Sequence, residues 1–135
     1  MKIKRALLSV WDKSGIVELG QFLSEQNIEI ISTGGTQKAL EKAGLQVTGM
    51  EDITGSGSVM DGRVKTLHPR IFGGILADRD NHQHMNDLKD LGGLKIDLVV
   101  VNFYPFIQEA VGKNLDFKRA IEFIDIGGPS MVRAA

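Results

Sequence analysis

The sequence predicts an α/β fold in which helices cover both faces of a doubly wound, mostly parallel sheet. Short apolar runs alternate along the chain with segments of helical periodicity, which is typical of parallel strands joined by crossover helices. The run 96–101 is almost continuously apolar, which predicts a strand buried on both faces. Polar or glycine-rich clusters at 9–14, 32–36 and 102–105 directly follow three apolar runs. Because ligands of such folds bind beyond the carboxyl ends of the strands, these clusters predict a binding site.

The composition fits one domain with an ordinary core. The chain has 135 residues, of which 42% are hydrophobic and 24% are charged. The formal net charge of -1 argues against nucleic acid or an acidic membrane as a partner. The absence of cysteine excludes disulfides and thiolate metal sites and suits a cytoplasmic location. The basic start is followed by too few apolar residues for a signal peptide or a membrane span.

The first half of the chain is predicted to hold three strands and two helices. The first strand is Ala6 to Val10, and Ser14 is placed to cap the helix after it. The apolar face of that helix comprises Ile16, Leu19, Phe22 and Leu23. A second strand at 28–31 leads to a short helix that stops at Gly44. Residues 45–50 predict a third, shorter strand.

The second half is predicted to hold one strand and three helices. Residues 51–62 are polar and rich in glycine, which predicts a mobile loop. The run 73–77 stays ambiguous. Helical periodicity covers 81–91 and 117–124, and Pro129 suits the first turn of a last helix.

The segment 62–69, Gly-Arg-Val-Lys-Thr-Leu-His-Pro, is termed the basic loop. Its terminal glycine and proline predict a shaped loop instead of a helix interior. Apolar Val64 and Leu67 alternate with its cations, so an extended backbone would aim the charges to one side. The side chains that would grip an anionic ligand are Arg63, Lys65 and Thr66. The alternative is a solvated turn in which His68 caps the next helix.

The segment 32–36, Ser-Thr-Gly-Gly-Thr, is termed the glycine turn and joins a strand to a helix. Its glycines let the backbone approach a ligand, and free N–H groups at the helix start favour an anion. The pattern is neither G-x-G-x-x-G nor a Walker loop. The alternative is a tight turn with Thr36 as the N-cap. Lys13 either supplies charge to the same anion or is solvated.

Three other positions leave alternatives open. Asp125 precedes a glycine pair at a helix start, where a carboxylate acts as a base, holds a ribose hydroxyl or caps the helix. Tyr104 is either a proton donor or the wall of a pocket. His82 and His84 stand two residues apart on a predicted helix and therefore point apart, so we expect no metal site there.

Five motifs together resemble a known family. They stand in order at 9–13 (Ser-Val-x-Asp-Lys), 32–36, 61–69, 101–106 (Val-Asn-x-Tyr-Pro-Phe) and 124–129 (Ile-Asp-Ile-Gly-Gly-Pro). The chain resembles, over essentially its whole length, the N-terminal inosine monophosphate cyclohydrolase domain of bifunctional purine-biosynthesis proteins. The resemblance implies a methylglyoxal synthase-like fold. It also implies closure of the purine ring of 5-formamidoimidazole-4-carboxamide ribotide, with loss of water, to give inosine monophosphate. It implies a purine nucleotide as the partner, no metal or organic cofactor, and a homodimer in the full-length protein.

The same resemblance assigns residues to the site. The expected catalytic side chains, for proton handling and oxyanion support, are those of Lys65, Tyr104 and Asp125. Lys13 and residues Thr33 to Thr36 are expected to hold the phosphate. Arg63, Lys65 and Thr66 are expected to line the nucleotide site, with Asn102, Asp125 and Ile126 near the base. The full set of expected substrate-binding residues is Ser9, Trp11, Asp12, Lys13, Thr33, Gly34, Gly35, Thr36, Arg63, Val64, Thr66, Leu67, His68, Asn102, Ile126, Gly127 and Gly128.

The chain departs from the family pattern at several places. Trp11 and Phe72 stand where the family commonly has serine and histidine, and Gly-Ser-Gly-Ser at 55–58 replaces Gly-Phe-Pro-Glu. A family lysine is expected just beyond Ala135, so we expect residues 1–135 to be one domain truncated at its C-terminus, without the transformylase domain. We expect such a chain to bind inosine monophosphate but to close the ring slowly. Two rivals stay open, a methylglyoxal synthase-like lyase and a regulatory module of the same fold that binds a phosphorylated effector.

Overall fold

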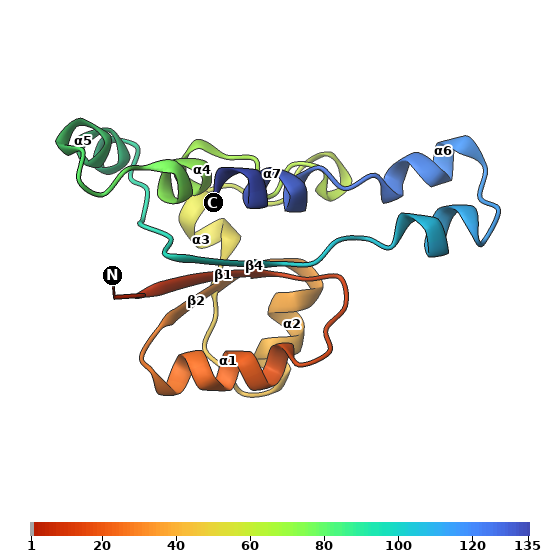
Figure 1. Cartoon of the computed structure of the whole chain (residues 1–135), viewed down its shortest axis with the longest axis horizontal. Helices are drawn as coiled ribbons and strands as arrows, with labels where there is room; N and C mark the ends of the chain where they lie inside the picture. The colour runs from red at the N-terminus through yellow and green to blue at the C-terminus, as the bar shows by residue number, and fades with distance from the viewer. Residues whose placement is uncertain (1) are drawn as a thin grey trace.

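The computed structural model describes residues 2–135, and four parallel strands form its centre (Figure 1). The strands are β1 (Arg5–Ser9), β2 (Glu29–Ser32), β3 (Thr48–Gly49) and β4 (Leu98–Val101), in the order β3-β2-β1-β4. In the register, Leu7 of β1 stands between Ile31 and Val99. The predicted parallel sheet is therefore confirmed.

Helices cover both faces of this sheet, as predicted (Figure 1). They are α1 (Ile16–Glu25), α2 (Gly34–Lys42), α3 (Met50–Thr54), α4 (Pro69–Leu76), α5 (His82–Asp90), α6 (Phe117–Ala120) and α7 (Gly127–Ala134). Three shorter elements are the 3-10 turns η1 (Met60–Gly62) and η3 (Ile121–Phe123) and the π-helical η2 (Ile107–Val111). No helix within residues 2–135 combines the length and apolar character needed to cross a membrane.

Alternation along the strands divides the core into two layers. Successive side chains of a strand point to opposite faces, so Leu7 and Leu8 of β1 belong to different clusters. The cluster under α1 and α2 comprises Ala6, Leu8, Ile16, Leu23, Ile30 and Leu40. The cluster under α3, α4 and α7 comprises Leu7, Ile31, Met50, Ile53, Ile71, Ile96 and Met131.

The structure corrects the predicted loop at 51–62. Its first part belongs to α3, whose Met50 and Ile53 lie three residues apart and are both buried in the core. An Asp52 carboxylate oxygen accepts a hydrogen bond from the Gly49 N–H at 3.0 Å, which caps the helix. The strand predicted at 45–50 shrinks to β3, and the ambiguous run 73–77 lies mostly in α4.

The predicted burial of β4 on both faces is only partial: Val99 and Val101 pack against one core cluster, and Leu98 and Val100 against the other. Its four residues are all half-buried, because β4 is an edge strand that pairs with β1. The predicted helix at 117–124 is α6, which tightens into η3. The helix predicted at 81–91 is α5, and Pro129 lies in the first turn of α7, as predicted.

Two predicted helix caps are wrong. The N-cap of α1 is Gly15, with φ +72°, while the Ser14 hydroxyl donates to Asp12. The N-cap of α2 is Thr33, and Thr36 lies buried inside the helix.

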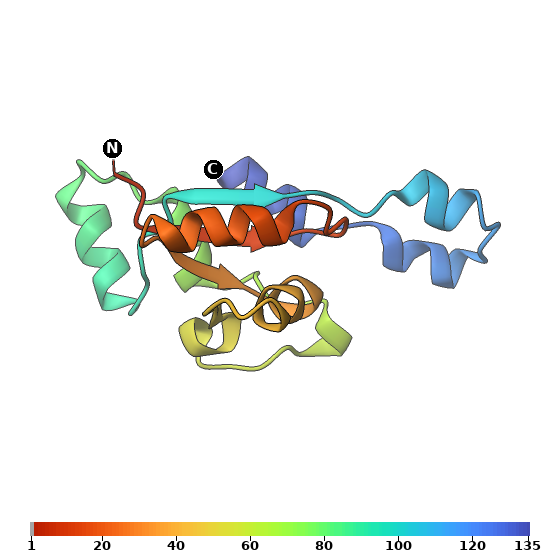
Figure 2. The ribbon, with the colours of Figure 1, turned by 90° about the horizontal axis from the view of Figure 1, so that it is seen from below.

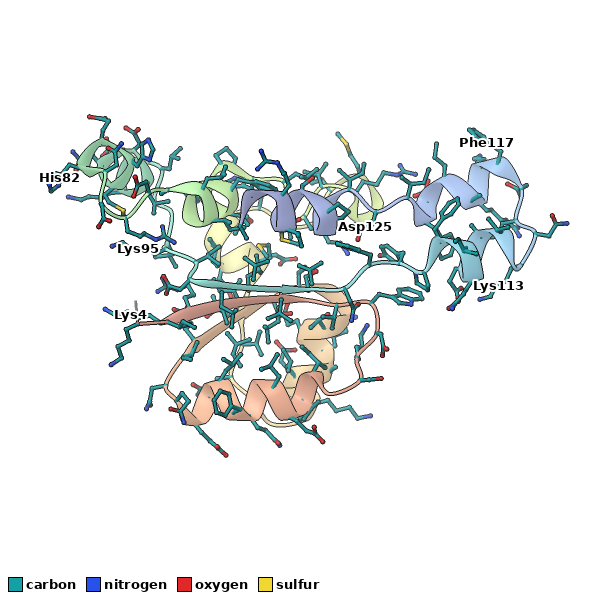
Figure 3. The ribbon with its side chains drawn as sticks, viewed as in Figure 1. Lys4, His82, Lys95, Lys113, Phe117 and Asp125 are labelled. Atoms are coloured by element: carbon teal, nitrogen blue, oxygen red, sulfur yellow. The ribbon has the colours of Figure 1, made fainter. Side chains whose placement is uncertain are left out.

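Residues 103–126, termed the arm, extend away from the sheet (Figures 1 and 2). The arm contains η2, α6 and η3, with Lys113 and Phe117 toward its tip and Asp125 at its root (Figure 3). The Phe117 side chain is 83% exposed and that of Ile107 is 76% exposed. The arm is thus the part of the fold that shares least in the core.

Candidate functional site

The clusters predicted to bind a ligand meet at one edge of the sheet. Residues 10–13, termed the β1 loop, follow β1, the glycine turn follows β2, and Asn102 follows β4. These strands are parallel, so their carboxyl ends share that edge. The tertiary structure therefore groups residues that lie more than 90 positions apart, such as Trp11 and Asn102.

The β1 loop is joined to the glycine turn. The Val10 N–H donates to the Thr36 hydroxyl at 3.0 Å, and that hydroxyl donates to the Val10 carbonyl at 3.0 Å. A Cβ placed on Gly35 would lie 3.2 Å from Lys13 Cε. Lys13 Nζ itself donates to the carbonyls of Val10 and Trp11. The Lys13 side chain therefore lies over the glycine turn. The Thr36 hydroxyl is used in hydrogen bonds to the Val10 backbone.

Asp12 shapes the same loop. Its carboxylate accepts hydrogen bonds from the Ser14 hydroxyl at 2.7 Å and the Ser14 N–H at 2.9 Å. These two hydrogen bonds, with the charge of Lys13 adding to them, hold the pKa of Asp12 below its ordinary value. The carboxylate is ionised at neutral pH and orders the turn into α1.

The basic loop brings Lys65 and Thr66 against other parts of the site. A Cβ placed on Gly34 would lie 3.6 Å from Lys65 Nζ, so this ammonium approaches the glycine turn. Thr66 is only 6% exposed, and its hydroxyl would lie 3.0 Å from a Cβ placed on Gly127. In the basic loop, Lys65 thus lies near the glycine turn, and the next residue, Thr66, lies near the start of α7.

Asn102 and three aromatic rings lie beside the β1 loop. The Asn102 amide oxygen accepts from the N–H groups of Trp11 at 2.6 Å and Asp12 at 3.0 Å, and its NH₂ group donates to the Asp12 carbonyl at 2.8 Å. The Trp11 ring lies 4.9 Å from that of Tyr104, which lies 6.1 Å from the ring of Phe123. Tyr104 thus packs against two aromatic rings, and both of its predicted uses stay predictions.

Asp125 lies just before the N-terminus of α7, whose N-cap residue is Ile126. One carboxylate oxygen accepts from the Gly128 N–H at 3.2 Å. A Cβ on Gly128 would lie 2.6 Å from the other carboxylate oxygen and 3.1 Å from Phe103, so only glycine fits there. The side chain of the next residue, Ile126, is exposed.

The remaining predicted residues of the basic loop make contacts with other parts of the protein. Arg63 forms an ion pair with Glu122 of the arm, and this guanidinium lowers the pKa of the Glu122 carboxyl. His68 Nδ1 accepts from the Arg70 N–H at 3.2 Å and caps α4, the alternative considered for this residue. Val64 forms an antiparallel bridge with Val59, and Leu67 is exposed. At the other end of the site, Ser9 pairs with Val101 in the sheet.

A comparison with known proteins assigns this chain to a family. The family model described as the MGS-like domain matches residues 15–130. The chain belongs to the MGS-like domain family. The fold that the five motifs implied is therefore confirmed for this MGS-like domain.

The MGS-like domain has close relatives among curated proteins. It is 55% identical over 133 residues to the bifunctional purine biosynthesis protein PurH of Clostridium acetobutylicum, covering 98% of this chain and 26% of that protein. It is 57% identical over 132 residues to PurH of Bacillus thuringiensis subsp. konkukian, with the same coverage. The chain thus spans about a quarter of the length of these relatives. Among solved structures, ForH superposes with a TM-score of 0.81 at 34% identity, covering 99% of this chain and 68% of that one.

This MGS-like domain also has a cavity of about 540 Å³ beside Lys65. Besides Thr33, Gly34 and the basic loop, its lining comprises six residues that were not predicted, namely Gln37, Lys38, Glu41, Met50, Glu51 and Ser58. The spacing of Gln37 and Glu41 predicts one helix face, and the Gln37 amide indeed donates to the Glu41 carboxylate at 2.8 Å. Nothing in the sequence indicates that this face would meet Lys65. Within residues 2–135, no three His, Asp or Glu side chains are grouped so as to hold a metal ion.

Proposed function

We propose that this chain is an inosine monophosphate cyclohydrolase, which closes the second ring of 5-formamidoimidazole-4-carboxamide ribotide. The observation that carries the proposal is identity of 55–57% to PurH proteins across 98% of this chain. Those relatives bear the name of a bifunctional purine biosynthesis protein. The substrate would accordingly be a purine nucleotide precursor that carries a phosphate.

The reaction needs no external reactant. The carboxamide nitrogen attacks the formyl carbon of the same molecule, and a C–N bond forms as the formyl oxygen gains charge. The carboxamide nitrogen loses one proton and the formamide nitrogen loses another, the formyl oxygen receives both, and its bond to carbon breaks as it leaves as water. Because both reacting groups belong to one molecule, a site that holds the substrate in a reactive conformation supplies much of the rate enhancement.

The phosphate end of the substrate is proposed to bind at the glycine turn. Backbone N–H groups at the start of a helix favour an anion, and α2 begins at Gly34. The position of Lys13 over Gly35 supports a cation at the same place. Gly35 is exposed and has no side chain of its own, so a phosphate that approached its backbone would meet the Lys13 side chain there.

The reacting end is proposed to lie between the basic loop and the root of the arm. Lys65 is an exposed ammonium that can stabilise charge on the formyl oxygen. Asp125 is a half-buried carboxylate that can take a proton from the carboxamide nitrogen, and Tyr104 offers a hydroxyl beside Trp11. We propose that these three side chains share proton transfer and charge stabilisation.

Ring closure by the chain and its Lys65→Met variant tests the proposal. We expect turnover to fall by roughly a hundredfold or more in Lys65→Met, typical of losing an electrostatic or proton-transfer group. The matched control is Lys95→Met, at the opposite end of the sheet (Figure 3), which should leave turnover unchanged.

The outcomes separate the rivals. A fall of less than about threefold, well under 1 kcal/mol in barrier height, would remove Lys65 from the chemistry. A wild-type chain that converts a triose phosphate, and not the formylated ribotide, would be a methylglyoxal synthase-like lyase. A chain that binds a phosphorylated effector and converts neither compound would be a regulatory module.

A homodimer in the full-length protein and a cytoplasmic location stay predictions. The exposed apolar surface of the arm supports a partner, because large apolar patches on soluble proteins usually mark interaction sites. Its exposed apolar side chains are those of Phe103, Tyr104, Phe106, Ile107, Val111, Phe117, Ile121, Ile124 and Ile126.

A further inference from the structure

The amide of Asn102 binds backbone on both of its polar sides. Its oxygen accepts two N–H groups of the β1 loop, and its NH₂ group donates to a carbonyl of the same loop, at distances of 2.6 to 3.0 Å. The residues joined in this way are 90 and 91 positions apart. A side chain that accepts from backbone N–H groups and also donates to a backbone carbonyl fixes the position of that backbone.

This arrangement leaves Asn102 poorly placed to recognise a base. Both acceptor positions of its oxygen are already occupied by N–H groups, and one N–H of its NH₂ group is used as well. Only the second N–H of the NH₂ group is left for a ligand, so accepting a hydrogen bond from the base would require breaking one of the bonds to the β1 loop. The amide therefore has a different use from the one that the family resemblance implies.

The β1 loop is thereby held at two points. Thr36 fixes its first residue, Val10, from the glycine turn, and Asn102 fixes Trp11 and Asp12 from the end of β4. The next residue is Lys13, whose side chain lies over Gly35. Loss of the second attachment would free the segment that carries this cation.

We infer that Asn102 is a positioning residue, which holds the β1 loop so that the Lys13 ammonium stands at the phosphate end of the site. The inference rests on the proposed function, because it assumes that the glycine turn receives a phosphate. Asn102 contributes to phosphate binding through Lys13, without contacting the nucleotide.

Two probes distinguish positioning from base recognition. Inosine monophosphate carries both a base and a phosphate, whereas ribose 5-phosphate carries the phosphate alone. We expect Asn102→Ala to weaken the binding of both probes by the same factor, about tenfold, as for the loss of one or two hydrogen bonds. Calorimetric titration measures both affinities. Weaker binding of inosine monophosphate alone, or unchanged binding of both probes, would overturn the inference.

A double-mutant cycle tests whether the effect passes through Lys13. Lys13→Met by itself should weaken the binding of both probes. Adding Asn102→Ala to Lys13→Met should then lower the affinities little further. Additive losses would show that Asn102 acts independently of Lys13, which the inference excludes. In a turnover assay, Asn102→Ala should raise KM and leave kcat nearly unchanged, since binding strength common to substrate and transition state is lost.

The position of the loop can be observed without any ligand. Trp11 is the chain's single tryptophan, so its fluorescence reports on the β1 loop alone. In Asn102→Ala we expect red-shifted emission and easier quenching by acrylamide, and unchanged emission would contradict the inference. If that variant does not fold, Asn102→Gln, which displaces the amide by one methylene, carries the same expectations.

Asn81→Ala is the matched control. The Asn81 oxygen also accepts two backbone N–H groups, from Gln83 and His84, but it caps α5 away from the site. It should leave both affinities and the Trp11 emission unchanged. If the wild-type chain binds both probes but does not close the ring, the proposed cyclohydrolase function is wrong, while the inference about Asn102 is not contradicted. A wild-type chain that binds neither probe would overturn both.

Discussion

The body of the molecule and its arm are stabilised in different ways. The body buries side chains completely on both faces of the sheet, with Leu7, Leu8, Ile31, Leu40 and Ile71 all at 0% exposure. In the arm, Ala110 is buried, while most of the large apolar side chains are exposed. Burial of apolar area is the main source of stability, so the body carries the fold and the arm contributes little.

This difference has a consequence for the site. Tyr104 and Asp125 stand at the two roots of the arm, outside both core clusters. Their positions depend on local contacts, which are the Trp11 ring against Tyr104 and the Gly128 N–H donating to Asp125. The glycine turn, by contrast, begins at the buried Ser32, whose hydroxyl donates to the Leu8 carbonyl at 2.7 Å. The phosphate end of the proposed site is therefore held by the core, and the reacting end by a few surface contacts.

Two isoleucines give the largest expected contrast between body and arm. Ile31→Ala empties a fully buried position between two strands and should lower the free energy of unfolding by about 2–5 kcal/mol. Ile107→Ala, where the side chain is 76% exposed, should change it by no more than about 0.5 kcal/mol. Urea denaturation of both variants measures the difference. Equal losses would mean that the arm is part of the cooperative core.

Adjacent glycines of α4 show how tightly the body is packed. A Cβ on Gly74 would lie 2.2 Å from the Leu94 carbonyl oxygen, so Gly74→Ala should destabilise the fold by about 1–3 kcal/mol. A Cβ on Gly73 would lie 3.4 Å from Leu88 Cδ1, an ordinary contact. Because alanine favours a helix over glycine, Gly73→Ala should stabilise the fold by up to about 1 kcal/mol. Thermal unfolding compares the two, and shifts of the same sign would contradict the described packing of α4.

The smallest expected effect concerns the ion pair that joins the arm to the basic loop. Arg63 lowers the pKa of Glu122, so the contribution of this pair is present above the ordinary carboxyl pKa and is lost as the pH falls through the lowered value. Both groups are exposed, so Glu122→Gln should leave stability at neutral pH unchanged within error. Carboxyl NMR titration should show the Glu122 midpoint rising in Arg63→Gln. An unshifted midpoint in that variant would mean that Arg63 does not cause the lowered pKa.

The sequence by itself determined the fold class, most elements and the family. Alternating and helical periodicity are local patterns, so strands such as Arg5–Ser9 and helices such as His82–Asp90 can be read from neighbouring residues. The polar clusters after the strands predicted the edge of the sheet where the candidate site lies, because chain direction is the same in every parallel strand. Five motifs in fixed order then indicated the MGS-like family.

Only the tertiary structure decided which partners these residues have. The helix α3 could not be predicted in a polar, glycine-rich segment. Only Met50 and Ile53 pack in the core, and over five residues such a pattern does not distinguish a helix from a loop. The exposure of β4 depends on its place at the edge of the sheet, which an apolar run does not specify. The pairing of Arg63 with Glu122 and of Asn102 with the β1 loop joins residues 59 and about 90 positions apart. A hydrogen bond depends on distance and direction between its groups, and for residues so far apart along the chain the folded sheet sets both.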